Sequence, residues 1–364
     1  MNAARFVRRT AGVLALAVLA FFALVPTGRY LLRAAWAEGR ILARARPISE
    51  LVRDSTTDAA TRRKLELVLA ARAFARDSVK LNARRGFTTY SHIDHDTLVV
   101  VLSAAYRDQL RYKTWWFPIV GSVPYKGYFD VRDARRAAAD LSRDGFDAYL
   151  RPASAFSTLG YLEDPLLSTT IDEDSVELVN TVIHELTHNT FYASGQAVFN
   201  ESFANFVGTR GAEWFYAARA DSARVALARL DWARQKTLGR FWSSVYNSVD
   251  SAFKAHRTSK SERLRARELV FASARERFAK EIAPQLPGYD PARPLPLRLD
   301  NAALMSRRMY RTGLDDFDAI YECEGERLPA AVTRIIALAR SNSKDPYAAI
   351  REYVRSGGAE ATAK

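Results

Sequence analysis

The chain has 364 residues, of which 48% are hydrophobic and 26% charged, a globular balance that excludes collagenous and disordered chains. Its single cysteine, Cys323, excludes an internal disulfide framework and a metal site built from thiolates. The formal net charge is +13, but no run of five Lys or Arg residues occurs, so nucleic acid is not an expected partner. Attraction to anionic lipid is the better interpretation of this charge.

The N-terminal segment predicts a membrane anchor. Three arginines at positions 5, 8 and 9 precede an apolar run over residues 11–25. Extended through Leu32, this stretch would form a helix about 33 Å long, enough to cross a bilayer. A cleaved signal peptide is the alternative, although no small-residue cleavage site stands out near Pro26. We therefore expect residues 1–28 to be a membrane anchor or signal segment.

The following residues predict strands early and helices late. Apolar residues recur every three and four positions over residues 30–46 and 58–80, which predicts two amphipathic helices. Nearly everything from residue 171 to 338 has helical periodicity. This order favours an α+β fold, with a small mixed sheet and a mostly helical C-terminal half. The predicted strands cover residues 97–105, 115–120, 148–151 and 157–162, around a helix at 131–143.

Residues 184–188 read H-E-L-T-H and predict a metal centre. A spacing of four places His184 and His188 on one face of a helix, where two imidazole nitrogens can share a metal ion. Glu185 points about 100° round the helix and can reach a water beside the metal, as a general base does. A structural helix with two core histidines is the alternative interpretation. The motif favours zinc, which is typically held by three protein ligands in catalytic sites.

Glu201 is the expected third ligand. The helix that carries His188 ends near Gly195, and a new apolar-periodic stretch begins by Phe199. Glu201 lies six residues after Gly195 and His188 seven before it, so an antiparallel hairpin returns this carboxylate beside the histidines. Asn205 lies one turn further on and could accept the free N–H of His184. The remaining histidines, His92, His95 and His256, are weaker candidates because their surroundings are polar or charged.

Several motifs together resemble a known family. Residues 45–48 (A-R-P-I), 121–129 (G-S-V-P-Y-K-G-Y-F), 157–160 (S-T-L-G) and 164–169 (D-P-L-L-S-T) precede H-E-L-T-H, and residues 199–202 (F-N-E-S) follow it. In this order they are similar to the bacterial predicted aminopeptidases, a zincin-like family tethered to the cell envelope. H-E-L-T-H followed by N-E-S-F-A also resembles the glutamate-zincin peptidases, although the twelve residues between His188 and Glu201 are fewer than in those enzymes.

The resemblance implies a zinc metallopeptidase, an aminopeptidase in particular, that acts on peptide or protein substrates. It implies a catalytic domain at residues 29–220, a helical region at 221–364, and a location at the bacterial inner membrane with the catalytic domain in the periplasm. Tyr161, Tyr128 and Tyr310 are candidates for the donor that stabilises the oxyanion. Two alternatives stay open, an envelope endopeptidase and a non-catalytic zinc-binding scaffold, and the sequence says nothing about the oligomeric state.

Overall fold

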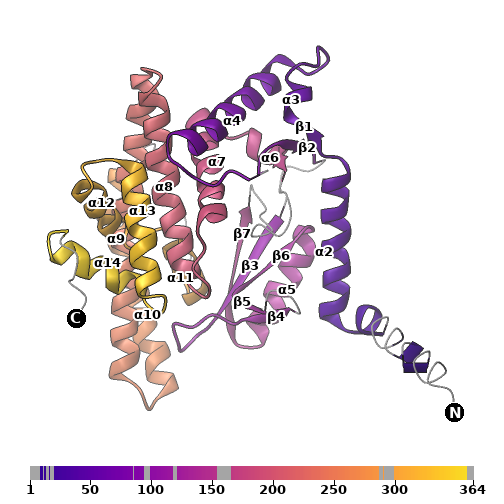
Figure 1. The fold of residues 1–364 in the computed structure, drawn as a ribbon. Helices are drawn as coiled ribbons and strands as arrows, with labels where there is room; N and C mark the ends of the chain where they lie inside the picture. The colour runs from indigo at the N-terminus through magenta and orange to yellow at the C-terminus, as the bar shows by residue number, and fades with distance from the viewer. Residues whose placement is uncertain are drawn as a thin grey trace.

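The chain folds as a mixed α+β protein in a computed structural model (Figure 1). The structure describes residues 9–358 except 11, 14, 15, 17–19, 85, 94–98, 118–120, 154–164, 287–289 and 291–298. The helices are α2 (Pro26–Ala43), α3 (Ile48–Leu51), α4 (Ala59–Asp77), α5 (Val131–Arg143), α6 (Ser168–Ile171), α7 (Ser175–Thr190), α8 (Ala197–Ala217), α9 (Ser222–Ala255), α10 (Lys260–Arg277), α11 (Asn301–Met309), α12 (Leu314–Cys323), α13 (Leu328–Ser341) and α14 (Pro346–Arg355), with short η1 (Phe278–Ile282) and η2 (Ala283–Gln285) turns after α10.

The main sheet has three antiparallel strands in the order β6-β3-β7. Central strand β3 (Val99–Tyr106) carries Leu102 and Ala104, which are buried against Leu141 of α5. The strand expected at 97–105 is thus confirmed over its described residues, 99–105, and the helix expected at 131–143 is confirmed. The other strands are β6 (Tyr125–Tyr128) and β7 (Phe146–Ala153) in this sheet, β1 (Arg46–Pro47), β2 (Thr89–Ser91) and β8 (Leu166–Leu167) in a second sheet, and the β4 (Trp115–Phe117) and β5 (Gly121–Val123) pair.

The largest hydrophobic cluster joins helices from both halves of the chain. It includes Val68 of α4, Ile183 of α7, Phe206 of α8, Phe317 of α12 and Ile350 of α14. Helix α8 lies at its centre and is buried on almost every side, which agrees with the distribution of its apolar residues all round the helix. Helices α12–α14 cover it on the left of Figure 1. The domain boundary expected after residue 220 stays a prediction.

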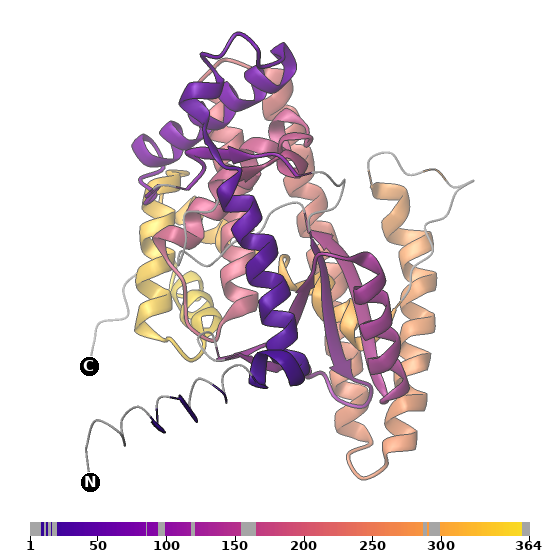
Figure 2. The same ribbon diagram turned by 90° about the vertical axis from the view of Figure 1, so that its right-hand side faces the viewer.

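A second hydrophobic cluster lies in the hairpin of α9 and α10. Trp242 and Val245 of α9 pack there with Phe271 of α10 and Leu304 of α11. Figure 2 shows this hairpin standing beside the main sheet. Because α11 also contacts β3 and β7, the hairpin, α11 and the sheet form one packed unit.

Two buried carboxylates connect distant parts of the chain. Asp147 of β7 accepts hydrogen bonds from Arg267 Nη1 of α10 at 2.8 Å and from the main-chain N–H of Asn301 at 3.0 Å. Asp318 of α12 accepts from Arg210 of α8 at 2.7 Å and from Lys236 of α9 at 2.6 Å. Each carboxylate is buried, so these partners compensate for the water that it loses on folding.

The N-terminal region corrects two expectations. Among the described residues, no helix is both long enough and apolar enough to cross a membrane. This finding overturns the predicted anchor helix and, with it, the predicted inner-membrane location. Tyr30, which the anchor would have required, belongs to α2 and packs against Phe117 and Tyr128 at ring distances of 5.7 and 5.9 Å. Arg33, one turn further along α2, pairs with Asp133 of α5 at 3.1 Å.

Candidate active site

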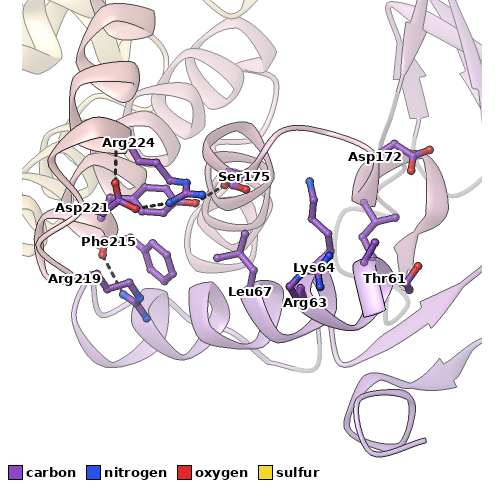
Figure 3. Close-up of a pocket in the computed structure, with 13 residues that line it drawn as sticks. Thr61, Arg63, Lys64, Leu67, Asp172, Ser175, Phe215, Arg219, Asp221 and Arg224 are labelled. Atoms are coloured by element: carbon purple, nitrogen blue, oxygen red, sulfur yellow. Dashed lines mark hydrogen bonds and ion pairs between the residues drawn. The ribbon is translucent and has the colours of Figure 1, made fainter. Parts of the chain in front are cut away.

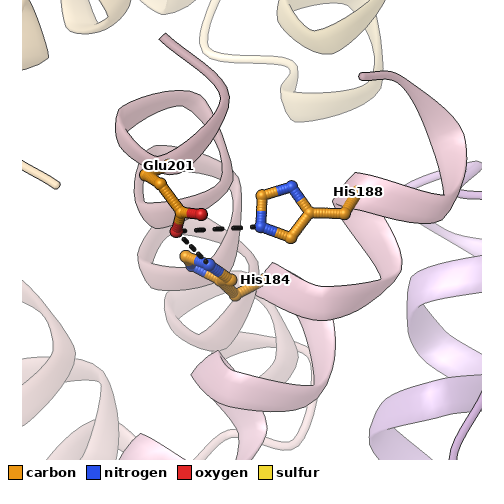
Figure 4. Close-up of side chains that lie close together, drawn as sticks. All are labelled: His184, His188 and Glu201. Atoms are coloured by element: carbon orange, nitrogen blue, oxygen red, sulfur yellow. Dashed lines mark ion pairs between the residues drawn. The ribbon is translucent and has the colours of Figure 1, made fainter. Parts of the chain in front are cut away.

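The hairpin of α7 and α8 brings the predicted ligands together. Figure 4 shows His184 and His188, from successive turns of α7, pointing toward Glu201 of α8. Glu201 Oε2 lies 3.5 Å from His184 Nε2 and 3.9 Å from His188 Nε2. Among the described residues, these three side chains offer ligand atoms that all lie within 4.8 Å of one another.

Local chemistry explains why the hairpin turns here. The Asp174 carboxylate caps the start of α7 by accepting from the main-chain N–H groups of Val176 and Glu177. After α7 ends, Gly195 adopts a φ of +75°, a conformation that glycine reaches without steric cost. The Asn200 side chain then accepts from Ala193 N and donates to Ala193 O, both at 2.8 Å. These contacts fix the turn between the histidines and the carboxylate.

Small residues on α8 allow it to lie close against α7. A Cβ added at Gly208 would lie 2.9 Å from the main-chain oxygen of Asn180 and 3.2 Å from His184 Cβ. A Cβ added at Gly211 would lie 2.9 Å from side-chain atoms of Ile183. The close approach of these helices therefore sets the position of His184.

The surroundings shift the pKa values of His184, His188 and Glu201 in different directions. Burial lowers the pKa of His188 to about 4, so its imidazole is neutral at neutral pH. Burial also disfavours the charged form of His184, but its hydrogen bond to Glu201 and the charge of Glu185 outweigh this and raise its pKa. Burial acts to raise the pKa of Glu201, yet the hydrogen bond from His184 and the nearby histidines lower it to about 2.

The donor set fits a divalent metal ion of the zinc type. Ligand atoms about 2.0–2.1 Å from a tetrahedral zinc ion are separated by roughly 3.3 Å, close to the two distances to Glu201. A neutral imidazole and an ionised carboxylate are the forms that bind a metal. His188 Nδ1 is buried and has no hydrogen-bond partner within the described part of the chain, which leaves the ring orientation to packing alone.

The other predicted site residues lie at different places relative to the cluster. Tyr310, directly after α11, lies beside the cluster, with its ring centroid 6.2 Å from that of His184. Asn205 donates from Nδ2 to the Tyr310 main-chain oxygen at 2.9 Å, so it holds Tyr310. Tyr128 packs against Tyr30 and is not brought to the cluster. Tyr161 lies outside the described residues. Glu185 follows His184 on α7 and is half-buried.

A family model described as "Putative aminopeptidase" matches residues 29–349, most of the chain. The chain belongs to this aminopeptidase family. No curated protein and no solved structure matches it. Membership of the aminopeptidase family indicates a peptidase that acts on peptide substrates.

Three residues near the cluster of this aminopeptidase-family chain were missed by sequence reasoning. Tyr192 lies next to His188, with ring centroids 6.2 Å apart. Tyr125 of β6 interacts electrostatically with Glu201 and Glu185, and burial raises its pKa to about 12. Arg151 of β7 donates to Tyr310 Oη at 2.9 Å, and its charge also helps to lower the pKa of Glu201. Of these three residues, only Tyr192 could have been predicted from the sequence, because it lies four residues after His188, the spacing that places two residues on one face of a helix.

The two other described histidines lie apart from this centre. His256 follows α9 and its Nδ1 lies 3.4 Å from the Glu262 carboxylate. His92 is exposed after β2. The centre therefore uses only the histidines of the H-E-L-T-H motif among those described.

A separate cavity of about 580 Å³ lies at the other end of the α7–α8 hairpin (Figure 3). Its lining includes Ser175 at the start of α7 and Tyr216 near the end of α8, whereas the metal-ligand cluster lies beside the turn. Its cations are mostly engaged, because Lys64 donates to the Glu173 oxygen and Arg224 pairs with Asp221. The cavity is therefore distinct from the cluster of predicted metal ligands.

Proposed function

We propose that this chain is a zinc-dependent aminopeptidase whose metal is held by His184, His188 and Glu201. The observation that carries this proposal is the convergence of three partly buried metal-ligand side chains, with the Nε2 atoms of His184 and His188 3.5 and 3.9 Å from Glu201 Oε2. The family name supports peptide hydrolysis as the reaction. Zinc, the zincin-like subtype and the mechanism below are part of the proposal.

Glu185 is the general base and acid of the proposed mechanism. Zinc bound at this centre would polarise the scissile carbonyl and lower the pKa of a nearby water. Glu185, adjacent to His184 on α7, takes a proton from the attacking water and later gives it to the leaving amine. Since a helix advances 100° per residue, its carboxylate points beside the ligand pair and not at the same point as the two imidazoles.

Tyr310 is the proposed donor to the developing oxyanion. Its hydroxyl oxygen accepts a hydrogen bond from Arg151 Nη2 at 2.9 Å, so its own proton is free to point toward a substrate. Burial, followed by the charge of Glu201, raises the pKa of Tyr310, which keeps the phenol protonated at neutral pH. A protonated phenol is the form that can donate to an oxyanion.

A pair of conservative variants separates the base from the ligand. Glu185→Gln removes only a proton acceptor, so zinc content should be unchanged while peptide hydrolysis falls by roughly 10²–10⁴-fold. Glu201→Gln weakens a ligand, so both zinc affinity and rate should fall. Zinc stoichiometry and kcat/KM on a panel of peptides measure the two effects.

Peptide-cleavage assays of the unsubstituted protein distinguish this proposal from a non-catalytic zinc-binding scaffold. If the zinc-loaded parent cleaves no peptide across a broad library, it is not a peptidase. If Glu185→Gln retains full activity on peptides that the parent cleaves, the assignment of the base is wrong.

A further inference from the structure

Four arginines lie close to Tyr310 in the sequence or in the structure. They are Arg151 of β7 and Arg307, Arg308 and Arg311 at the end of α11. Within the described part of the chain, none of them forms an ion pair with a carboxylate. Buried or half-buried arginines are usually paired, so this concentration of positive charge needs an explanation.

Neutral groups hold these side chains in place. Arg307 lies over the Trp242 ring at 5.2 Å and Arg308 over the Tyr246 ring at 4.0 Å. Arg311 donates from Nε to the Gln235 side chain at 2.6 Å. Arg151 donates to Tyr310 Oη at 2.9 Å and its guanidinium also lies 5.3 Å from that ring. Aromatic rings and amides orient a guanidinium but do not neutralise it, and Arg151 and Arg311 reach the carboxylates of Glu201 and Asp231 only through longer-range electrostatic interactions.

Polar atoms beside these arginines are buried without partners. The hydroxyl of Tyr112 has no hydrogen-bond partner among the described residues, and neither has Arg308 Nε. Tyr112 pairs with Ala105 of β3, and Arg151 pairs with Val101, four residues away and therefore on the same face of that strand. Helix α11, which carries Arg308, packs against β3 and β7. Burial raises the pKa of Tyr112, and the charges of Arg151 and Arg308 oppose this rise. A buried donor without an acceptor costs about 1–3 kcal/mol, and an anion that accepts from several such donors would remove that cost.

We propose that Arg151, Arg308 and Tyr112 form a subsite that binds a carboxylate of the peptide substrate. The guanidinium of Arg151 and the hydroxyl of Tyr112 are donors, and a carboxylate oxygen is the acceptor that suits both. This inference rests on the proposed function, because it names the substrate class that the same site selects.

Distance limits where the carboxylate lies on the substrate. Tyr310 separates Arg151 from the metal-ligand cluster, with 2.9 Å from Arg151 to its hydroxyl and 6.2 Å from its ring to that of His184. An extended peptide covers about 3.3–3.6 Å per residue. A carboxylate at Arg151 is therefore one or two residues from the cleaved bond. The substrate carries it either as the C-terminal carboxylate of a di- or tripeptide or as an acidic side chain beside the cleaved bond.

Binding to a catalytically silent protein tests the subsite without relying on hydrolysis. Full-length Glu185→Gln is titrated in a calorimeter with alanyl-alanine, alanyl-alanine amide and alanyl-glutamate amide. At least one of the two carboxylate peptides should bind roughly 10–100-fold more tightly than alanyl-alanine amide, as expected for charge-assisted hydrogen bonds. Preference for alanyl-alanine identifies the C-terminal carboxylate, and preference for alanyl-glutamate amide identifies the side chain.

Second substitutions in the same background assign the preference to the arginines. Arg151→Gln should abolish it, and Arg308→Gln should reduce it about tenfold, whereas Arg151→Lys should retain most of it because the charge remains. Arg132→Gln, at a site whose side chain is 86% exposed on α5, is the control and should leave the preference unchanged. A circular dichroism spectrum confirms that each variant is folded, and Arg308→Gln carries the test if Arg151→Gln does not fold.

Three outcomes would overturn the subsite. They are equal binding of acid and amide peptides, no binding of any of the three, or a preference that survives in both Arg151→Gln and Arg308→Gln. Hydrolysis of alanyl-alanine amide by the parent separately tests the proposed function. If the parent hydrolyses alanyl-alanine and alanyl-alanine amide with equal kcat/KM, the peptidase is supported and the subsite is contradicted. If the protein binds a carboxylate peptide selectively but hydrolyses none of the peptides, the subsite is supported and the peptidase is contradicted.

Discussion

At the scale of single residues, Tyr310 is held from two sides. Arg151 donates to its hydroxyl and Asn205 donates to its main-chain oxygen, each at 2.9 Å. Two such contacts fix both the ring and the backbone, which is the preorganisation that oxyanion stabilisation requires. Asn205, expected to orient His184, thus orients a different group of the same site.

Tyr310→Phe should lower kcat by roughly 10²–10³-fold, because it removes one donor to the oxyanion and leaves the ring in place. Zinc content should not change, since no metal ligand is altered. Steady-state kinetics with a zinc assay measures both. A variant that loses zinc together with activity would show that Tyr310 supports the metal centre instead.

The affinity for zinc should depend on pH through a single proton. The pKa of His188 is about 4 and that of Glu201 about 2, so both are already deprotonated above about pH 4. His184 has a raised pKa and holds a proton up to the ordinary range of histidine, about 6.5, and above. Zinc must displace that proton, so its dissociation constant should rise about tenfold for each unit by which the pH falls from 6.5 toward 4.

Competition with a chelating dye at several pH values measures this slope. A hundredfold rise per pH unit would mean that His188 is protonated as well. A flat profile would mean that His184 does not bind the metal.

At the scale of elements, the approach of α7 to α8 depends on Gly208. Gly208→Ala would press a methyl group against Asn180 and His184, so the helices must separate by several tenths of an ångström. Such overpacking costs about 1–3 kcal/mol of unfolding free energy, and it should also weaken zinc binding by moving His184. Denaturant unfolding and the zinc dissociation constant measure the two consequences.

Gly39→Ala is a matched control for this substitution. Gly39 lies within α2 and a Cβ there would meet no atom within 4 Å. Alanine in a helix interior is favoured over glycine by about 0.5–1 kcal/mol, so this variant should be slightly more stable. If Gly208→Ala and Gly39→Ala lower the free energy of unfolding equally, the close approach of α7 and α8 is not the cause of the loss at Gly208.

The same hairpin shows what sequence could predict. His184, His188 and Glu201 lie within 18 residues of one another, and helix periodicity with one glycine turn is enough to bring them together. Arg151 reaches the cluster from a strand and Tyr310 from a distant helix, and no local pattern contains that packing. Tyr125 and Tyr128 lie three residues apart on β6 and so face opposite sides of the sheet, and only the tertiary structure decides which side holds the cluster.

At the scale of the whole molecule, Asp318 joins three helices. Arg210 of α8 and Lys236 of α9 pair with it, and Trp232 of α9 donates to it at 2.8 Å. Asp318→Asn removes the carboxylate that pairs with Lys236 and leaves Arg210 with Glu213 alone, so it should lower the free energy of unfolding by about 3–5 kcal/mol. Thermal and denaturant unfolding measure the loss.

Asp315→Asn on the same helix is the control. Asp315 pairs with Arg240, but their side chains are 48% and 64% exposed, and such pairs contribute about 0–1 kcal/mol. If Asp318→Asn and Asp315→Asn lose the same free energy of unfolding, burial of Asp318 is not the cause of its larger expected effect.

Asp147 imposes an order of events on synthesis of the chain. Its carboxylate lies in β7, yet its partner Arg267 comes 120 residues later. A ribosome that adds about 5–20 residues per second takes roughly 6–24 s to supply that arginine. During this interval only Arg107, which lies 3.4 Å from Asp147 and is 39% exposed, would compensate the carboxylate that the newly made sheet buries, so the strands would gain less from closing. The N-terminal half should thus close less firmly until the helices that follow it are made, and truncation after α8 would leave Asp147 with Arg107 alone and without Arg267.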